Sequence, residues 1–176
     1  MNILVILLLL LAGIIALLLI VAIYTRKDYI INREIVIDAP LHNVFDYLKH
    51  LKNQDEFNKW VMVDPEMKRE FKGTDGTVGF IYGWNGNKKV GEGEQEIKSI
   101  VEGKKIETEI RFVRPMSSIA YSDLLTEPLS DNKTKVKWRN SGKMIFPMNL
   151  MVRMIERMLS KDMDISLINL KNILEK

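Results

Sequence analysis

The sequence predicts an α+β protein in which a curved antiparallel β-sheet wraps around one long C-terminal helix, after a single N-terminal transmembrane helix. Three observations predict this arrangement. The run from Ile3 to Ile23 carries no charge, apolar and polar residues alternate in several segments between Met67 and about Asn140, and apolar residues recur every three or four positions after Pro147. Alternation is typical of half-buried strands, and the longer period is typical of an amphipathic helix.

The N-terminal run is long enough to cross a bilayer, because a helix rises about 1.5 Å per residue and the hydrocarbon core is roughly 30 Å thick. A cleaved secretory signal is the alternative. It would have a basic start, a shorter apolar stretch and a small-residue cleavage site, whereas this run leads directly into Tyr24-Thr25-Arg26-Lys27. Basic residues near a span tend to stay in the cytosol. We therefore predict a single-pass membrane anchor with its flank over residues 1–25, and a domain over residues 26–176 on the cytoplasmic side.

The composition argues against several classes of site. All 26 basic and 23 acidic residues lie from Arg26 onward and are interleaved, so the net charge of +3 creates no strong basic field for nucleic acid. Cysteine is absent, which excludes disulfides, thiolate nucleophiles and cysteine-based metal sites. His42 and His50 have no serine or acidic partner at a readable spacing. We expect no metal, no cofactor, no catalytic set and no nucleic-acid partner.

The domain begins with one strand and two short helices. Residues 30–37 alternate in a β-branched strand pattern. Asp38-Ala39-Pro40 then supplies a capping side chain and an early-turn proline, and apolar residues between Leu41 and Leu48 follow at helical spacing. The spacing of apolar residues from Asn53 to Val61 predicts the second short helix.

Five or six antiparallel strands follow, each with one apolar and one charged face, as a sheet with one face in water requires. On the wet face, Glu92, Glu94 and Glu96 alternate about 7 Å apart. We interpret them as a solvated charge lattice with lysines and Arg111, and not as catalytic carboxylates. The turn dipeptides that separate the strands are Asp75-Gly76, Asn85-Gly86, Glu102-Gly103 and Asp131-Asn132.

One long amphipathic helix follows from about Met148. Its apolar residues continue for about 28 positions, or roughly 40 Å, which is enough to cross the apolar face of a small sheet. A sheet wrapped around this helix buries both apolar faces. Methionine adapts to irregular space, so we expect the methionines of this region to line part of a cavity. They are Met144, Met148, Met151, Met154, Met158 and Met163.

Two motifs carry a resemblance to a known superfamily. They are Ile35-Val36-Ile37-Asp38-Ala39-Pro40 and Val44-Phe45-Asp46-Tyr47-Leu48, followed by Trp60. Together with the order of elements, they resemble the SRPBCC superfamily of START lipid-transfer domains, pollen-allergen-like proteins and polyketide cyclases, which has the helix-grip fold. The resemblance covers roughly Tyr29 to Lys176, and the polyketide cyclase/dehydrase-like branch is the most similar. It implies a hydrophobic cavity between the sheet and the long helix, without a universal set of catalytic residues.

We therefore predict that the cavity binds a hydrophobic small molecule or lipid next to the membrane. Gln95 faces inward by strand parity, where it either orients a ligand or bonds a neighbouring side chain or water. Two alternatives stay open: a cyclase- or dehydratase-type enzyme that uses Gln95 or Tyr82, and a protein-binding regulator that resembles the chaperone ATPase activator branch. The expected ligand-binding residues are Trp60, Phe80, Tyr82, Trp84, Gln95, Ile97, Phe112, Trp138, Met148, Met151, Ile155 and Met158.

Overall fold

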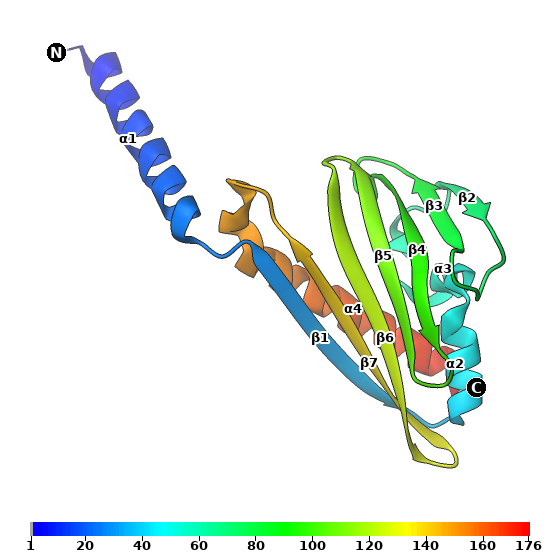
Figure 1. The fold of residues 1–176 in the computed structure, drawn as a ribbon. Helices are drawn as coiled ribbons and strands as arrows, with labels where there is room; N and C mark the ends of the chain where they lie inside the picture. The colour runs from blue at the N-terminus through cyan, green and yellow to red at the C-terminus, as the bar shows by residue number, and fades with distance from the viewer. Residues whose placement is uncertain (1) are drawn as a thin grey trace.

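The computed structural model describes residues 2–176 and has the predicted order of elements (Figure 1). The helices are α1 (Ile3–Tyr24), α2 (Leu41–Lys49), α3 (Gln54–Phe57) and α4 (Val152–Leu174), with 3₁₀ turns η1 (Leu51–Asn53), η2 (Val61–Val63) and η3 (Met148–Met151). The strands are β1 (Asp28–Ile37), β2 (Lys68–Lys72), β3 (Ile81–Asn85), β4 (Glu92–Val101), β5 (Lys105–Arg114), β6 (Ser118–Ser130) and β7 (Lys133–Lys143). The predicted α+β class and the long C-terminal helix are confirmed.

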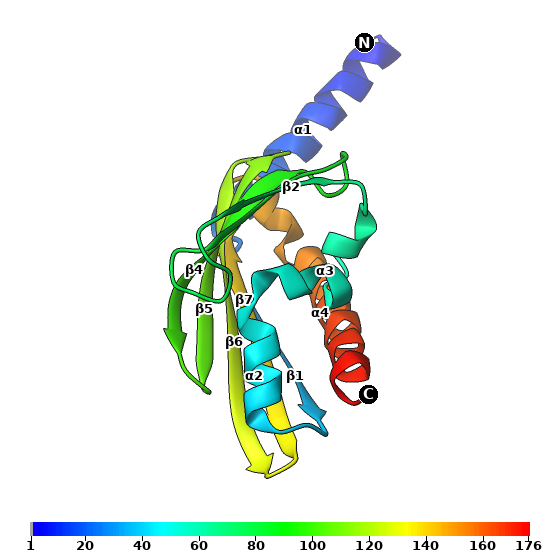
Figure 2. The ribbon, with the colours of Figure 1, turned by 90° about the vertical axis from the view of Figure 1, so that its right-hand side faces the viewer.

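All the strands join one antiparallel sheet in the order β1-β7-β6-β5-β4-β3-β2. The sheet is curved, and α2, α3 and α4 lie on its concave side (Figure 2). The convex side is charged, because Arg111 forms ion pairs with Glu94, Glu96 and Glu109 across neighbouring strands. The predicted lattice of solvated charges on this face is therefore confirmed.

Two apolar clusters hold the helices against the concave face. In the larger cluster, Leu167 and Leu170 of α4 pack with Val136 of β7 and other buried residues from β1, β6 and α2. In the smaller cluster, Leu51 of η1 packs with Phe80 and with strands β3 and β4. A fully buried side chain of this kind contributes roughly 1.5–3 kcal/mol, so both clusters fix the helices over the sheet.

Two local predictions at the start of the domain are wrong. Asp38 does not cap α2: Pro40 is the N-cap residue, no side chain bonds the first turn, and the Asp38 carboxylate instead pairs with Lys133 (3.5 Å). The second predicted helix is broken into η1, α3 and η2. Asn58 ends α3, because its Oδ1 accepts a hydrogen bond from the backbone N–H of Trp60 (3.1 Å), and such local side-chain bonds compete with helix continuation.

Helix α1 extends away from the domain (Figure 1). Its 22 residues give a length of roughly 33 Å, and every side chain except that of Ala22 is exposed. The helix is long and apolar enough to span a membrane. Only three residues, Thr25 to Lys27, connect it to β1.

Candidate ligand-binding cavity

A cavity of about 510 Å³ lies between the concave face of the sheet and the helices that cover it. This volume is within the range of roughly 300–1,000 Å³ that is typical of small-molecule sites. Every strand except β2 contributes to the wall: Tyr29, Tyr82, Trp84, Gln95, Ile110, Phe112, Arg114, Ala120 and Asn140. The helices and loops contribute Gln54, Asn58, Trp60, Val61, Val63, Met67, Lys89, Val90, Pro115, Met158, Leu159 and Asp162.

Six of the twelve predicted ligand-binding residues line this cavity: Trp60, Tyr82, Trp84, Gln95, Phe112 and Met158. Phe80, Ile97 and Trp138 are buried in the core. Ile155 is half-buried outside the cavity wall, and Met148 and Met151 are exposed before and at the start of α4. Of the six methionines near the C-terminal helix, Met158 lies on the wall, and three others are exposed on the surface: Met148, Met151 and Met154.

A glycine makes room for the aromatic part of the wall. Gly93 on β4 lies opposite Trp84 on β3 and Phe112 on β5. The two rings meet edge to face across it, with centroids 5.9 Å apart. A Cβ atom at position 93 would lie 2.6 Å from the Trp84 ring and 2.6 Å from the carbonyl oxygen of Arg111. The absence of a side chain at Gly93 therefore permits this aromatic pair.

The carboxamide of Gln95 belongs to a chain of hydrogen bonds under α3. Asn58 Nδ2 donates to Gln54 Oε1 (2.9 Å), and Gln54 Nε2 donates to Gln95 Oε1 (3.2 Å). Gln95 Nε2 donates to Thr108 Oγ1 (2.8 Å), whose hydroxyl donates to the backbone carbonyl of Ser122 (2.8 Å). Of the two roles predicted for Gln95, the structure shows the bond to neighbouring side chains. These bonds orient the carboxamide and fix the polar part of the wall.

The phenol of Tyr82 is hydrogen-bonded to two charged side chains, Asp55 of α3 and Arg69 of β2. Its hydroxyl donates to the Asp55 carboxylate and accepts from Arg69 Nε (3.1 Å), and Arg69 also pairs with Asp55 (2.9 Å). Burial, and then the hydrogen bond to Asp55, raise the pKa of Tyr82. A phenol with a raised pKa stays protonated and is a weak acid at neutral pH, so this geometry does not favour Tyr82 as a general acid or base. Within residues 2–176, no group of His, Asp or Glu side chains is placed to hold a metal ion.

Asp162 of α4 attaches the loop before η2 to the helix. Its carboxylate accepts hydrogen bonds from Trp60 Nε1 (3.1 Å) and from the Lys59 ammonium group. The Lys59 backbone N–H also donates to Ser166 Oγ (3.0 Å), one turn further along α4. These contacts hold the Trp60 ring in the cavity wall between α4 and the sheet.

Two buried polar side chains of the wall face the cavity. Asn140 of β7 is 4% exposed and lines the cavity. Tyr29 of β1 is also buried and lines it. Burial raises the pKa of Tyr29, so its hydroxyl is a neutral donor and acceptor. Both groups are available to a ligand.

The cavity reaches solvent beside its exposed lining residues, which include Lys89, Arg114 and Pro115. Lys89 lies on the β3–β4 connection, Arg114 is the last residue of β5, and Pro115 follows it on the β5–β6 connection. Gly91 allows the β3–β4 connection to lie close to the end of β5. It has a positive φ of 73°, and a Cβ atom there would lie 2.2 Å from the carbonyl oxygen of Arg114. In an antiparallel sheet of this order, both connections lie at the end where β1 begins and α1 is attached. The opening is therefore on the anchor side of the domain (Figure 1).

Sequence reasoning missed most of the polar lining. Strand parity alone places Tyr29 with Ile31, and Asn140 with Trp138, on the concave face, so those two residues were predictable. Gln54, Asn58 and Asp162 depend on where the short helices break and how α4 is rotated. Lys89 lies on the β3–β4 connection, and Arg114 ends β5 two residues after Phe112.

The architecture defines the fold. A seven-stranded antiparallel sheet wrapped around a long C-terminal helix is the helix-grip fold of SRPBCC-type proteins, and the predicted superfamily resemblance is confirmed at the level of the fold. No family model matches the sequence, and no curated protein matches it.

Solved structures from several organisms have the same fold. One is norcoclaurine synthase from Thalictrum flavum in complex with dopamine and hydroxybenzaldehyde, with 12% identity, a TM-score of 0.62, and coverage of 88% of this chain and 90% of that one. The Aha1 dimer from Colwellia psychrerythraea has 16% identity and a TM-score of 0.58, and the match covers 84% and 96% of the two chains. Protein CV1439 from Chromobacterium violaceum has 16% identity, a TM-score of 0.57, and coverage of 84% and 97%. At these identities, the likeness establishes the fold alone.

Proposed function

We propose that this protein is a membrane-anchored binding module that holds a hydrophobic small molecule or lipid in the cavity between the sheet and α4. The observation that carries the proposal is a cavity of about 510 Å³ whose mainly apolar wall contains two buried polar side chains, Asn140 and Tyr29. An amide and a hydroxyl each donate and accept hydrogen bonds, so these two side chains can orient a molecule held in the cavity.

The wall indicates the chemistry of the ligand. Aromatic and aliphatic residues favour an apolar body, and Asn140 offers both a donor and an acceptor. The exposed ammonium group of Lys89 at the opening favours a polar or anionic end that faces solvent. The norcoclaurine synthase structure of the same fold is a complex with two small aromatic molecules, which supports a role for this fold in holding compounds of that size.

The anchor would place the cavity beside the bilayer. Helix α1 is exposed along its length and followed by Arg26 and Lys27, so by the positive-inside tendency the domain faces the cytoplasm. Because the chain lacks cysteine, the single variant Lys133→Cys reports this orientation by reaction with a membrane-impermeant maleimide. We expect labelling only in permeabilised cells. Labelling in intact cells would contradict the orientation.

Native mass spectrometry of the full chain, released from detergent micelles, tests the binding function. We expect a bound apolar molecule on the wild-type protein and none on Ala120→Phe, because Ala120 is buried in the cavity wall and a phenyl ring there fills the space. The matched control is Ile119→Phe on the same strand, where the side chain is exposed on the other face.

Asn140→Leu provides a second test that leaves the cavity volume nearly unchanged. We expect it to weaken binding of the copurified molecule by roughly tenfold, which corresponds to one hydrogen bond of about 1.4 kcal/mol. An empty wild-type cavity, or equal occupancy in wild type, Ala120→Phe and Asn140→Leu, would overturn the proposed function.

A further inference from the structure

The segment between β7 and the second turn of α4 carries a group of exposed apolar side chains. Their exposed fractions run from 36% to 55%, although large apolar side chains are normally buried. Contiguous exposed apolar patches mark interaction surfaces for proteins or membranes. We call this group the apolar ridge; it consists of Ile145, Phe146, Met148, Leu150, Met151 and Met154.

The apolar ridge is fixed against the end of α1. Asn149 of η3 is fully buried, and its Nδ2 donates to the backbone carbonyls of Ala22 (2.6 Å) and Thr25 (2.9 Å). Ala22 is the one buried residue of α1. The backbone N–H of Met144 donates to the carbonyl of Lys27 (2.8 Å), on the connection that follows. The ridge therefore lies at the level where α1 would leave the hydrocarbon core.

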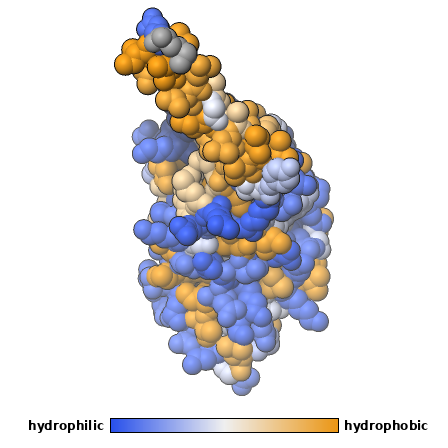
Figure 3. Space-filling view, turned by 90° about the vertical axis from the view of Figure 1, so that its left-hand side faces the viewer, coloured by the Kyte–Doolittle hydropathy of each residue, from blue (hydrophilic) through white to orange (hydrophobic). Residues whose placement is uncertain are grey.

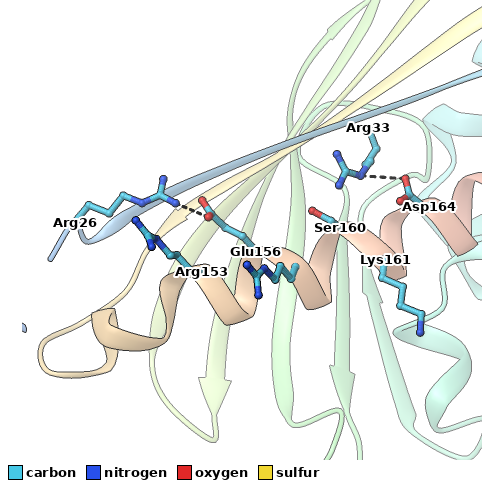
Figure 4. A pocket seen from close by; sticks show the side chains of 8 residues that line it. Arg26, Arg33, Arg153, Glu156, Ser160, Lys161 and Asp164 are labelled. Carbon is cyan, nitrogen blue, oxygen red and sulfur yellow. Dashed lines mark hydrogen bonds and ion pairs between the residues drawn. The ribbon is translucent and has the colours of Figure 1, made fainter.

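A basic groove of about 510 Å³ lies beside the ridge, between β1 and α4 (Figure 4). Arg26 pairs with Glu156, and Arg33 pairs with Asp164 (3.1 Å). Three further basic side chains line the groove and form no ion pair within residues 2–176: Arg153, Arg157 and Lys161. The groove therefore has an excess of three positive charges, which is suited to a phosphate group.

The two surfaces lie next to each other at the start of α4. Met151 and Met154 of the ridge are three positions apart, and Arg153, Arg157 and Lys161 of the groove recur at steps of four. Figure 3 shows the hydrophobic surface of α1 continuing onto the adjoining end of the domain, with hydrophilic surface beyond it. A helix with one apolar and one basic stripe is typical of elements that lie in a membrane interface.

We propose that this end of the domain docks on the bilayer that holds α1, with the apolar ridge among the acyl chains and the basic groove on the phosphates of anionic lipid headgroups. The inference rests on the proposed membrane span of α1 but not on the cavity ligand. The apolar ridge is continuous with α1, and the basic groove lies beside it. Both features favour lipid as the occupant over a second copy of the chain. Docking would bring the cavity opening, on the same end of the sheet, to the membrane surface.

Depth measurements on the full chain in liposomes test the docking. Because the chain has no cysteine, Phe146→Cys provides a single site for an environment-sensitive fluorophore, and Asp131→Cys in the β6–β7 turn, at the other end of the sheet, is the matched control. We expect the label at position 146 to shift to the blue and to be quenched by lipids that carry a quencher below the headgroups. The label at position 131 is expected to show neither effect.

The lipid dependence tests the basic groove. The quenched fraction at position 146 should rise when phosphatidylglycerol replaces about one third of the phosphatidylcholine. Arg153→Gln with Arg157→Gln should lower the ratio of docked to undocked protein by roughly 30-fold in these liposomes, taking about 1 kcal/mol for each basic residue near an anionic surface. Lys104→Gln with Lys133→Gln, at the far end of the domain, is the matched control and should have little effect.

Several results would overturn this inference. A water-exposed label at position 146 in both lipid compositions excludes docking. A label shielded from water but not quenched by lipid, with chains that cross-link through position 146, identifies a second copy as the occupant. If inorganic phosphate saturates the groove in liposomes of neutral lipid, and phosphatidylglycerol does not change the quenched fraction at position 146, the groove binds a free anion and not a lipid headgroup. Release of the protein from membranes by alkaline carbonate would refute the membrane span of α1 and with it the docking. Binding in the cavity is measured separately by native mass spectrometry and would not be decided by this result.

Discussion

Replacing Gly93 with alanine tests whether the aromatic wall of the cavity depends on the missing side chain. The new methyl group would lie 2.6 Å from both the Trp84 ring and the carbonyl oxygen of Arg111. Contacts below 3.0 Å force a shift, and a shift of the indole disturbs its edge-to-face contact with Phe112 (5.9 Å).

The expected loss of stability follows from this overlap. Overpacking costs about 1–3 kcal/mol, and for a domain of this size each kcal/mol lowers Tm by about 2–4 °C. We expect the Tm of Gly93→Ala to fall by about 2–12 °C, with a changed tryptophan emission spectrum. Thermal unfolding of the full chain in detergent micelles, followed by near-UV circular dichroism, measures the effect.

The controls separate the overlap with Trp84 from a general effect of substitution on β4. Lys98→Ala, at an exposed position of the same strand, should change stability by less than about 0.5 kcal/mol. In a double-mutant cycle, Trp84→Leu should reduce the cost of Gly93→Ala, because residues in contact couple energetically. An unchanged Tm and emission spectrum in Gly93→Ala, or additive effects in the cycle, would refute the reasoning.

Three further predictions concern other contacts. Burial and the bond to Asp55 raise the pKa of Tyr82; above about pH 10 the unfolded chain therefore releases a proton that the folded chain keeps. Stability should fall as the pH rises, and Tyr82→Phe should reduce that fall in urea titrations. Hydrogen bonds from Arg111, and then from Lys98, lower the pKa of Glu96, so their stabilisation is present at neutral pH and lost as the pH falls below about 4. Arg111→Gln should therefore reduce the drop in Tm as the pH falls below about 4. The same drop in wild type and variant would exclude a contribution of the Arg111–Glu96 ion pair to stability. Asn149→Leu should broaden spin-label distances between α1 and the domain with little change in the domain's Tm, because it removes the hydrogen bonds from Asn149 Nδ2 to Ala22 and Thr25. Unchanged distances would show that these bonds do not fix α1 to the domain.

The sequence predicted the faces of the sheet better than the shape of the cavity. Strand parity correctly placed Phe80, Tyr82 and Trp84 on one face, because that period is a property of the extended backbone. Parity does not determine which of these residues is covered. Phe80 packs against Leu51 of η1 and is not part of the cavity wall, whereas Trp84 is only partly buried and lines the cavity.

The polar part of the site and the role of the methionines depend on tertiary structure. Gln54 and Asn58 reach Gln95 because the chain breaks into short helices over the sheet, and a helical period over this segment does not reveal the break. The rotation of α4 places Met163 in the core and Met154 at the surface. Met154 lies nine positions before Met163, which is about half a turn around the helix, so the two side chains lie on opposite faces of α4 and only Met163 is on the face that packs against the sheet.

The three-residue connection between α1 and β1 limits how far the domain could travel from an anchored helix. Three fully extended residues reach about 10 Å, much less than the separation of two apposed organelles or vesicles. A molecule held in this domain would exchange within a small area of its own leaflet. Delivery to another compartment would then require the acceptor to approach, so the protein would act as a stationary reservoir or sensor.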